Sequence, residues 1–373
     1  MTALAHLPLV GITVIDLTSN IAAPFAGAVL ADLGADVVHV ESRIGDDSRR
    51  MSPRIGDTSA YWHVVNRNKS VLRLDIREDT DRAQLDELLG RADVFITNLR
   101  PAKLTKYRLD APSLTLAYPR LIHASLSAYG DAGDERDRAG YDAVLQARTG
   151  IAEVTGTHDG PPVRAGVSIL DVGSGTWLAL GVLAAPLNRQ STGRGGAVAT
   201  SLFETGASWV AYHVAANQIS GEPSERHGSG HPAFAPYGIF ATKDHQVCLG
   251  IGGDDLFRRL CVALERSELA DAPRYARNVD RVANNAALRA TLESILSEMT
   301  AVDVIERLER QGVACDLVQK PEELLTDPQA LATQVFITEP VEGFGDLRFP
   351  GLPLTFDGER PQVRHTGQHG GHP

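Results

Sequence analysis

Short hydrophobic runs alternate with stretches of helical spacing along the first half of the chain. Residues 10–17 predict a buried strand, and Pro24 suits the first turn of a helix over about 24–33, which Gly34 would end. Residues 36–41 predict the next strand, completing a β-α-β unit with a right-handed crossover. Further strands are expected over residues 71–75, 92–99, 121–129 and 197–203. This alternation predicts an α/β fold with a Rossmann-like parallel sheet.

The segment around Asp171 combines a short apolar run, a carboxylate and two glycines. Residues 168–170 precede it, Gly173 and Gly175 follow it, and an apolar helical stretch runs over about 176–189. We predict a strand that ends at Asp171, with glycines that let a ligand approach the backbone. The alternative is that Asp171 only N-caps the following helix.

The second half of the chain has a different pattern. Residues 220–236, rich in Gly, Ser, Pro and His, indicate a linker or a mobile loop. A hairpin is expected over residues 237–251, helices over 254–265, 286–299 and 301–311, and strands over 335–341 and 347–356. We therefore predict a large domain of residues 1–205 with 326–373, a linker over 206–225 and a small α+β domain over 226–325.

Composition narrows the class of protein. The net charge of −11 over 373 residues argues against non-specific binding to nucleic acid or to an anionic membrane. Three widely spaced cysteines favour neither a zinc site nor a disulfide framework. The longest apolar run, residues 177–187, is too short for a membrane span, and the N-terminus lacks the pattern of a signal peptide. We expect a cytoplasmic protein without a metal.

Several common catalytic and nucleotide-binding motifs are absent from the sequence. The first strand enters its helix through residues 18–24, without the glycines that a dinucleotide pyrophosphate needs. There is also no P-loop, no His-Glu-x-x-His and no Gly-x-Ser-x-Gly. A nicotinamide dehydrogenase is therefore disfavoured, although the fold class would suit one.

A series of sequence blocks, spread over nearly the whole chain, carries a stronger signal. Among them are Leu30-Ala31-Asp32-Leu33-Gly34-Ala35-Asp36, Asn66-Arg67-Asn68-Lys69-Ser70, Asn98-Leu99-Arg100-Pro101, Asp137-Arg138-Ala139-Gly140-Tyr141-Asp142, Gly193-Arg194-Gly195 and Gly312-Val313-Ala314-Cys315. No single block is specific. In this order they resemble the family III CoA-transferases, the CaiB/BaiF family that includes formyl-CoA transferase.

The resemblance implies a reaction at Asp171, which takes the place of the family's catalytic aspartate. Its carboxylate would form a mixed anhydride with the acyl group of an acyl-CoA, and then an aspartyl-CoA thioester. No tightly bound cofactor is implied, because coenzyme A enters and leaves as part of the substrates. The site must exclude water, and the backbone N–H groups of Val172 and Gly173 are candidates for stabilising the oxyanions.

The resemblance also implies two groups of binding residues and an interlocked homodimer. The residues expected to bind CoA are Ala22, Ala23, Pro24, Arg43, Arg77, Asn98, Leu99 and Lys106. Those expected around the acyl group are Ile21, Tyr141 and Asp142, with Gly228, Gly230 and His231 in a loop that closes as a lid. The alternatives are core packing for Tyr141 and an ordinary inter-domain linker for the loop.

Some positions depart from the family pattern. Ile21 and Ser42 stand where formyl-CoA transferase has a polar residue and a CoA-binding arginine, which counts against formate or oxalate as the acid. The α-methylacyl-CoA racemases of the same superfamily have a histidine after Gly140, where this chain has Tyr141, so we favour a transferase over a racemase. A non-catalytic CoA-binding protein is a further alternative. The sequence does not name the acyl donor or the acceptor acid.

Overall fold

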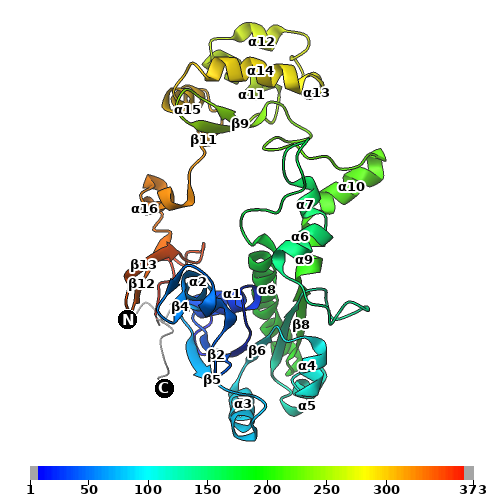
Figure 1. Ribbon diagram of the computed structural model, residues 1–373, viewed down its shortest axis with the longest axis vertical. Coiled ribbons are helices and arrows are strands. Elements are labelled where there is room, and N and C mark those ends of the chain that lie inside the picture. The colour runs from blue at the N-terminus through cyan, green and yellow to red at the C-terminus, as the bar shows by residue number, and fades with distance from the viewer. Residues whose placement is uncertain (1–6, 365–373) are drawn as a thin grey trace. The chain divides into compact units, whose positions relative to one another are not determined.

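The computed structural model describes residues 7–364, which divide into two compact units (Figure 1). The first unit runs to Ile151, resumes over Arg164–Ala215 and resumes again from Asp327. The second unit consists of Ala152–Val163 and Ala216–Thr326. A short internal segment thus belongs with the second unit, a feature that the sequence pattern did not suggest.

A six-stranded sheet forms the centre of the first unit. Its strands are β1 (Thr13–Leu17), β2 (Asp36–Glu41), β5 (Ser70–Arg73), β6 (Val94–Thr97), β7 (Ile122–Ser127) and β8 (Gly196–Ser201). They lie in the order β5-β2-β1-β6-β7-β8, and every neighbouring pair is parallel, which confirms the predicted parallel sheet. The order reverses direction between β1 and β6. Open parallel sheets bind ligands at the carboxyl ends of the strands beside such a point.

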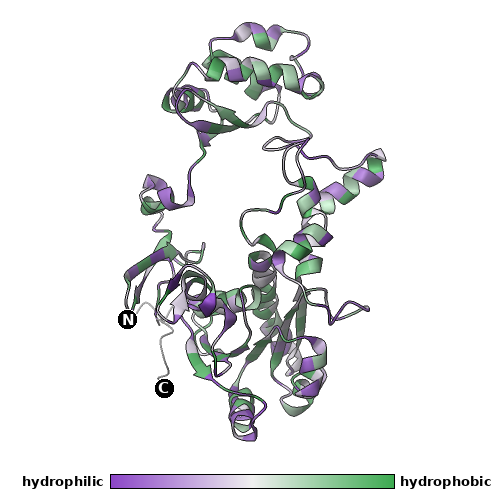
Figure 2. Ribbon diagram, viewed as in Figure 1, coloured by the Kyte–Doolittle hydropathy of each residue, from purple (hydrophilic) through white to green (hydrophobic). Residues whose placement is uncertain are grey.

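Both faces of this sheet are covered by helices. Val14 and Ile96 belong to a core cluster with α1 (Ala22–Asp32) and α8 (Ile169–Thr192), while the alternate residues Ile15 and Phe95 belong to a second cluster. That second cluster includes residues of α3 (Asp79–Arg91), α4 (Pro101–Lys106) and α5 (Ala111–Ala117). The strands at the centre of the sheet are buried on both faces: all four residues of β6 are buried, as are the first five of β7, and Figure 2 shows hydrophobic segments in this sheet.

Shorter elements complete the first unit. They are η2 (Asp47–Arg50), β3 (Arg54–Ile55), β4 (Thr58–Ser59), α2 (Ala60–Asn66), α6 (Asp142–Arg148), α9 (Leu202–Trp209), α16 (Pro328–Ala332), β12 (Phe336–Val341) and β13 (Gly345–Pro350). Strands β12 and β13 form an antiparallel hairpin. The buried side chain of Glu339 hydrogen-bonds His63 at 3.0 Å, which joins this hairpin to α2.

The second unit is an α+β structure with its own core. Strands β9 (Tyr237–Ala241), β10 (Gln246–Gly250) and β11 (Cys315–Leu317) form an antiparallel sheet. Its helices are α11 (Asp254–Ala263), α12 (Ser267–Asp271), α13 (Asn278–Ala283), α14 (Asn285–Leu296) and α15 (Ala301–Arg310), with η3 (Pro321–Leu325). Helices α7 (Ile151–Val154) and α10 (Ala211–Ser220) run across the limits of the two units, so much of the predicted 206–225 linker is helical.

Helix α8 is longer than the sequence pattern indicated. It extends beyond residues 177–187 at both ends, and by length and composition it could cross a membrane. The expectation that this segment is too short to span a membrane is therefore wrong. Leu178, Ala179 and Val182 are buried in the core cluster that α8 shares with α1 and the sheet, as in a core helix.

Candidate active site

Asp171 lies in the first turn of α8, so the predicted strand before it is wrong. The helix begins at Ile169, and Gly173 and Gly175 lie within it. Both glycines are needed for packing: a Cβ at Gly173 would lie 2.3 Å from the ring of Trp209, and one at Gly175 would lie 2.4 Å from a backbone oxygen of α1. Close helix packing explains glycines that the sequence pattern attributed to a ligand loop.

The expected oxyanion donors are also wrong. The Val172 N–H donates to the Ser168 carbonyl at 3.1 Å, as the first hydrogen bond of the helix. Gly173 lies inside α8, where helical geometry directs its N–H to the carbonyl four residues earlier. Neither N–H is directed at a bound acyl group in this arrangement.

The N-terminal N–H groups of α8 are capped by Asp142. Its Oδ2 accepts hydrogen bonds from the N–H of Leu170 at 2.8 Å and of Asp171 at 3.3 Å. Asp142 is buried, and Ser168 at the N-cap position makes no side-chain cap of its own. The capping role considered for Asp171 thus belongs to a residue of α6.

The Asp171 carboxylate is left without such partners. Among the described residues, no hydrogen-bond donor or cation pairs with it. Burial raises the pKa of Asp171 from 3.8 to about 7, and the nearby charge of Asp142 adds to the effect. A carboxylate with a strongly raised pKa beside a cavity is a typical feature of a reactive site.

Asp171 opens onto a cavity of about 380 Å³. Ile21, Ala22 and Tyr141 line the same cavity, as their predicted roles require. Tyr141 is 69% exposed, so the alternative of core packing is wrong for this residue. Four basic side chains also line the cavity: Arg100, Lys103, Arg136 and Arg138. The four cations outnumber the two acidic side chains of the lining, Asp47 and Asp171, which suits an anionic substrate.

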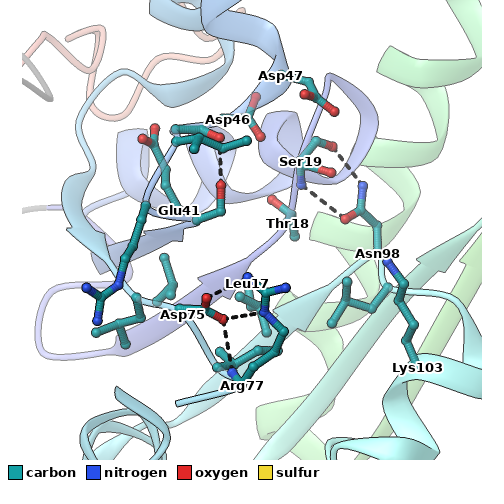
Figure 3. Close-up of a pocket in the computed structure, with 18 of the residues that line it drawn as sticks. Leu17, Thr18, Ser19, Glu41, Asp46, Asp47, Asp75, Arg77, Asn98 and Lys103 are labelled. Carbon is teal, nitrogen blue, oxygen red and sulfur yellow. Dashed lines mark hydrogen bonds and ion pairs between the residues drawn. The ribbon is translucent and has the colours of Figure 1, made fainter. Parts of the chain in front are cut away.

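A second cavity of about 570 Å³ adjoins the first at the carboxyl ends of β1, β2 and β6 (Figure 3). The residues that line both are Ser19, Asp47, Asn98, Leu99 and Lys103. The amide of Asn98 accepts from the Ser19 N–H at 3.0 Å and donates to the Ser19 carbonyl at 2.8 Å, which fixes the loop after β1. The two cavities therefore form one groove beside the point where the strand order reverses.

Comparisons with known proteins identify relatives of the chain. The family model described as CoA-transferase family III matches residues 9–372. The chain belongs to CoA-transferase family III. This CoA-transferase is 34% identical to the acetyl-CoA:oxalate CoA-transferase of Acetobacter aceti, over 97% of this chain and 94% of that relative. It is 34% identical to the succinate–glutarate CoA-transferase of Agrobacterium fabrum, over 87% and 83%.

A solved structure supports the same assignment for the transferase. A CaiB/BaiF family protein from Brucella suis superposes with a TM-score of 0.85 at 32% identity, covering 96% of this chain and 95% of that one. The resemblance inferred from the sequence blocks is thus confirmed, and so is the class of enzyme.

The residues expected to bind CoA are placed unevenly in the transferase. Arg43, Arg77, Asn98 and Leu99 line the larger cavity, and Ala22 lines the smaller one. Ala23 and Pro24 are buried against the core and line neither of these two cavities, so their side chains are closed to a ligand. Lys106 lines neither cavity either, and its Nζ lies 5.4 Å from the centre of the Tyr107 ring.

Other residues have roles that the sequence did not indicate. Lys103, one helical turn before Lys106, lines both cavities. Asp142 does not line either cavity and acts instead through backbone N–H groups. The one sequence signal for this role is that Asp142 and Gln146 lie four residues apart, a spacing at which side chains on a helix can hydrogen-bond.

The predicted lid residues Gly228, Gly230 and His231 belong to the second unit. Their loop is held within that unit, since the Gly228 N–H donates to the Gly156 carbonyl at 2.8 Å. The His231 ring lies 4.9 Å from that of Phe234 and 5.6 Å from that of Tyr237. Within residues 7–364, no cluster of three or more His, Cys, Asp or Glu side chains could hold a metal ion.

Proposed function

We propose that this transferase moves CoA from an acyl-CoA to a carboxylic acid through covalent intermediates on Asp171. The observation that carries the proposal is the state of the Asp171 carboxylate, which faces a cavity without a hydrogen-bond partner among the described residues. Its pKa is raised to about 7, so an appreciable fraction is ionised at neutral pH, and that fraction is a better nucleophile than an ordinary aspartate.

The reaction proceeds by four acyl transfers. The Asp171 carboxylate attacks the thioester carbonyl of the donor, forming a mixed anhydride and releasing the CoA thiolate. The thiolate attacks the aspartyl carbonyl, giving an aspartyl-CoA thioester and the free donor acid. The acceptor carboxylate attacks that thioester, forming a second anhydride and releasing the thiolate again. Attack of the thiolate on the acceptor acyl carbonyl then gives the new acyl-CoA and restores Asp171.

The larger cavity is proposed to hold the phosphate-bearing part of CoA. Arg43, Arg77 and Lys103 supply cations there, and Leu99 supplies apolar surface. Arg77 already makes a two-bond ion pair with Asp75, at 2.8 and 2.6 Å, and Arg43 pairs with Asp81 at 2.9 Å. These exposed pairs hold the guanidinium groups in place at small energetic cost, and their outer N–H groups can reach a phosphate.

The acids are proposed to be dianionic, such as dicarboxylates. Four cations line the smaller cavity; Arg136 and Arg138 pair with Asp137 and Glu135, and Arg100 and Lys103 remain to hold a second carboxylate besides the reacting one. Relatives of the chain are named for oxalate, succinate and glutarate, which agrees with this class. Ile21 and Ser42 stand where formyl-CoA transferase has a polar residue and an arginine. This difference disfavours formate and oxalate, so among the dicarboxylates we favour the longer ones.

The anhydride must be protected from water, and we keep the loop with Gly228, Gly230 and His231 as the proposed lid. Hydrogen bonds hold this loop within its own unit. A cytoplasmic location, where three free cysteines stay reduced, belongs to the same proposal.

A homodimer is proposed from an apolar hollow of about 580 Å³ on α8 and α9. Its hydrophobic lining consists of Val167, Ile169, Val172, Trp177, Leu180 and Trp209. Trp177 is 45% exposed and Leu180 53%, an apolar surface that favours burial by a second copy of the chain. Sedimentation of the Leu180→Glu variant should show dissociation, and an unchanged dimer or a monomeric wild type would exclude this surface.

The function is tested by Asp171→Ala with a panel of acyl-CoA donors and carboxylic acids, read by mass spectrometry. We expect no transfer, while calorimetry shows CoA affinity largely unchanged. Transfer at a near-normal rate would overturn the mechanism. Incubation of the wild type in deuterated water without an acceptor tests the racemase alternative, because α-deuteration of a 2-methylacyl-CoA requires that chemistry. Absence of transfer with every pair would favour a CoA-binding protein.

A further inference from the structure

Gln146 lies on helix α6 with its side chain fully buried, and it is connected to the helix of Asp171 through Asp142. Its Nε2 donates to Oδ1 of Asp142 at 2.5 Å, and its Oε1 accepts from the backbone N–H of Ala165 at 2.8 Å. Only this orientation of the amide matches a donor to the carboxylate and an acceptor to the N–H. Gln146 therefore connects Asp142 to the segment that leads into α8.

The other oxygen of Asp142 is directed at the start of α8. It accepts from the N–H groups of Leu170 and Asp171, which would otherwise lack partners at a helix N-terminus. A nearby aspartate is a favoured partner for such groups, and Asp171 itself is the nearest one in sequence. With Asp142 in this place, the Asp171 carboxylate is not drawn back onto its own helix, and it faces the cavity.

We propose that Gln146 is a positioning residue for acyl transfer: its amide holds Asp142 on the N–H groups of α8 and so keeps the Asp171 carboxylate available to the substrate. This inference rests on the proposed function of Asp171. Gln146 touches neither of the two cavities of the groove, so it acts only through Asp142.

The proposal depends on a donor that stays a donor at every pH. A glutamate at position 146 has nearly the same shape, but it can donate to Asp142 only while it is protonated. Once ionised, it would repel Asp142 at hydrogen-bonding distance and weaken its hold on α8.

The other charged groups on the packed elements have partners of their own. On α6, Arg148 pairs with Glu135 at 3.3 Å, and on α9, Glu204 accepts from the Ser201 hydroxyl at 2.7 Å. On α8, Asp171 is the acidic group whose pKa responds to Asp142. Because wild type and variant share these groups, the ratio of their rates isolates position 146.

The test compares Gln146→Glu with wild type across pH, using steady-state transfer between an acyl-CoA and an acid. The ratio of variant to wild-type kcat is expected near one at about pH 5.5 and lower by about 10-fold or more at about pH 8.5. The KM for acyl-CoA should stay unchanged. Gln146→Leu, which never donates, should be impaired at every pH, and thermal unfolding of each variant reports whether it is folded.

Two results would overturn the proposal: a ratio that is independent of pH, or a folded Gln146→Leu enzyme with near-normal kcat. If Gln146→Leu does not fold, the pH dependence of Gln146→Glu alone tests the proposal. In that variant a change of pH converts the side chain at position 146 from a protonated donor to an ionised carboxylate within one folded preparation. Asp171→Ala, measured alongside, separates the two claims. If Asp171→Ala is inactive and the ratio is independent of pH, only the role proposed for Gln146 is refuted. If Asp171→Ala is active, the proposed function itself is refuted.

Discussion

Gly175 of α8 lies against Ala22 of α1 so closely that a Cβ at position 175 would be 2.4 Å from the Ala22 carbonyl oxygen. Real Cβ atoms essentially never come that near another heavy atom. The helix that carries Asp171 and the helix start that lines the same cavity therefore touch through backbone at this point.

Gly175→Ala should consequently separate the two helices. The obstacle is a backbone oxygen, which cannot rotate away, so we expect destabilisation of about 1–3 kcal/mol and a clear loss of transfer. Gly90→Ala in α3 is the control, since its Cβ would meet only the Tyr118 ring at 3.8 Å. That variant should keep its activity and gain slightly in thermal stability from helix propensity. Equal behaviour of the two variants would refute the importance of the contact.

The raised pKa of Asp171 predicts a pH-dependent gain in stability when the charge is removed. Its folded pKa of about 7 lies above the ordinary 3.8, so the folded state binds the proton more tightly than the unfolded state. Folding stability from this group therefore falls as pH rises from about 4 to 7, and the loss is complete above pH 7.

Thermal unfolding of Asp171→Asn checks this prediction. Its midpoint should exceed that of wild type by several degrees at about pH 8, and the difference should vanish toward about pH 4. Asp57→Asn, at an exposed aspartate, is the matched control. A constant difference between Asp171→Asn and wild type over this range would contradict the raised pKa.

Two lysines on one helix predict different effects on CoA binding. Lys103 lines both cavities, whereas Lys106 lines neither and lies beside the Tyr107 ring. We expect Lys103→Met to weaken acyl-CoA binding by about 10-fold, the value of one hydrogen bond to a charged group, with a smaller effect at high salt. Lys106→Met should bind almost as wild type does. Calorimetric titration with CoA measures both, and a reversed order would place CoA elsewhere.

The cations of the smaller cavity predict a preference for a second carboxylate. Arg100, at the N-cap of α4, lines the cavity that contains Asp171. Arg100→Gln should raise the KM for succinate by about 10-fold and leave butyrate, which has one carboxylate, little changed. An equal change for both acids would mean that Arg100 does not recognise the distal group.

The sequence predicted most of the fold because hydrophobic period and helix length are local signals. The six parallel strands, the hairpin of β9 and β10 and helices α11, α14 and α15 all lie close to their expected ranges. The start of α8 was missed because two glycines after an aspartate are typical of a loop. Their cause, the ring of Trp209 and the backbone of Ala22, comes from distant parts of the chain.

The candidate site was predictable to a similar degree. Asp171 stands out in the local sequence pattern, the family resemblance implies its role and those of Ile21 and Tyr141, and all three line one cavity. The choice between Lys103 and Lys106 depends on which side of a short helix faces the groove, and periodicity does not decide that. The role of Asp142 in capping α8 was not predictable from local sequence. Asp142 lies on α6, and the Leu170 N–H that it accepts from is 28 residues later in the chain.

The central claim is that Asp171 carries the acyl group and then CoA. Its most direct test is to incubate the enzyme with acyl-CoA, add hydroxylamine and map the modified residue by peptide mass spectrometry. Hydroxylamine converts an anhydride or thioester of aspartate into a hydroxamate, so the modification should appear at Asp171 only when acyl-CoA is present. A hydroxamate at another carboxylate, or none during active transfer, would contradict the account.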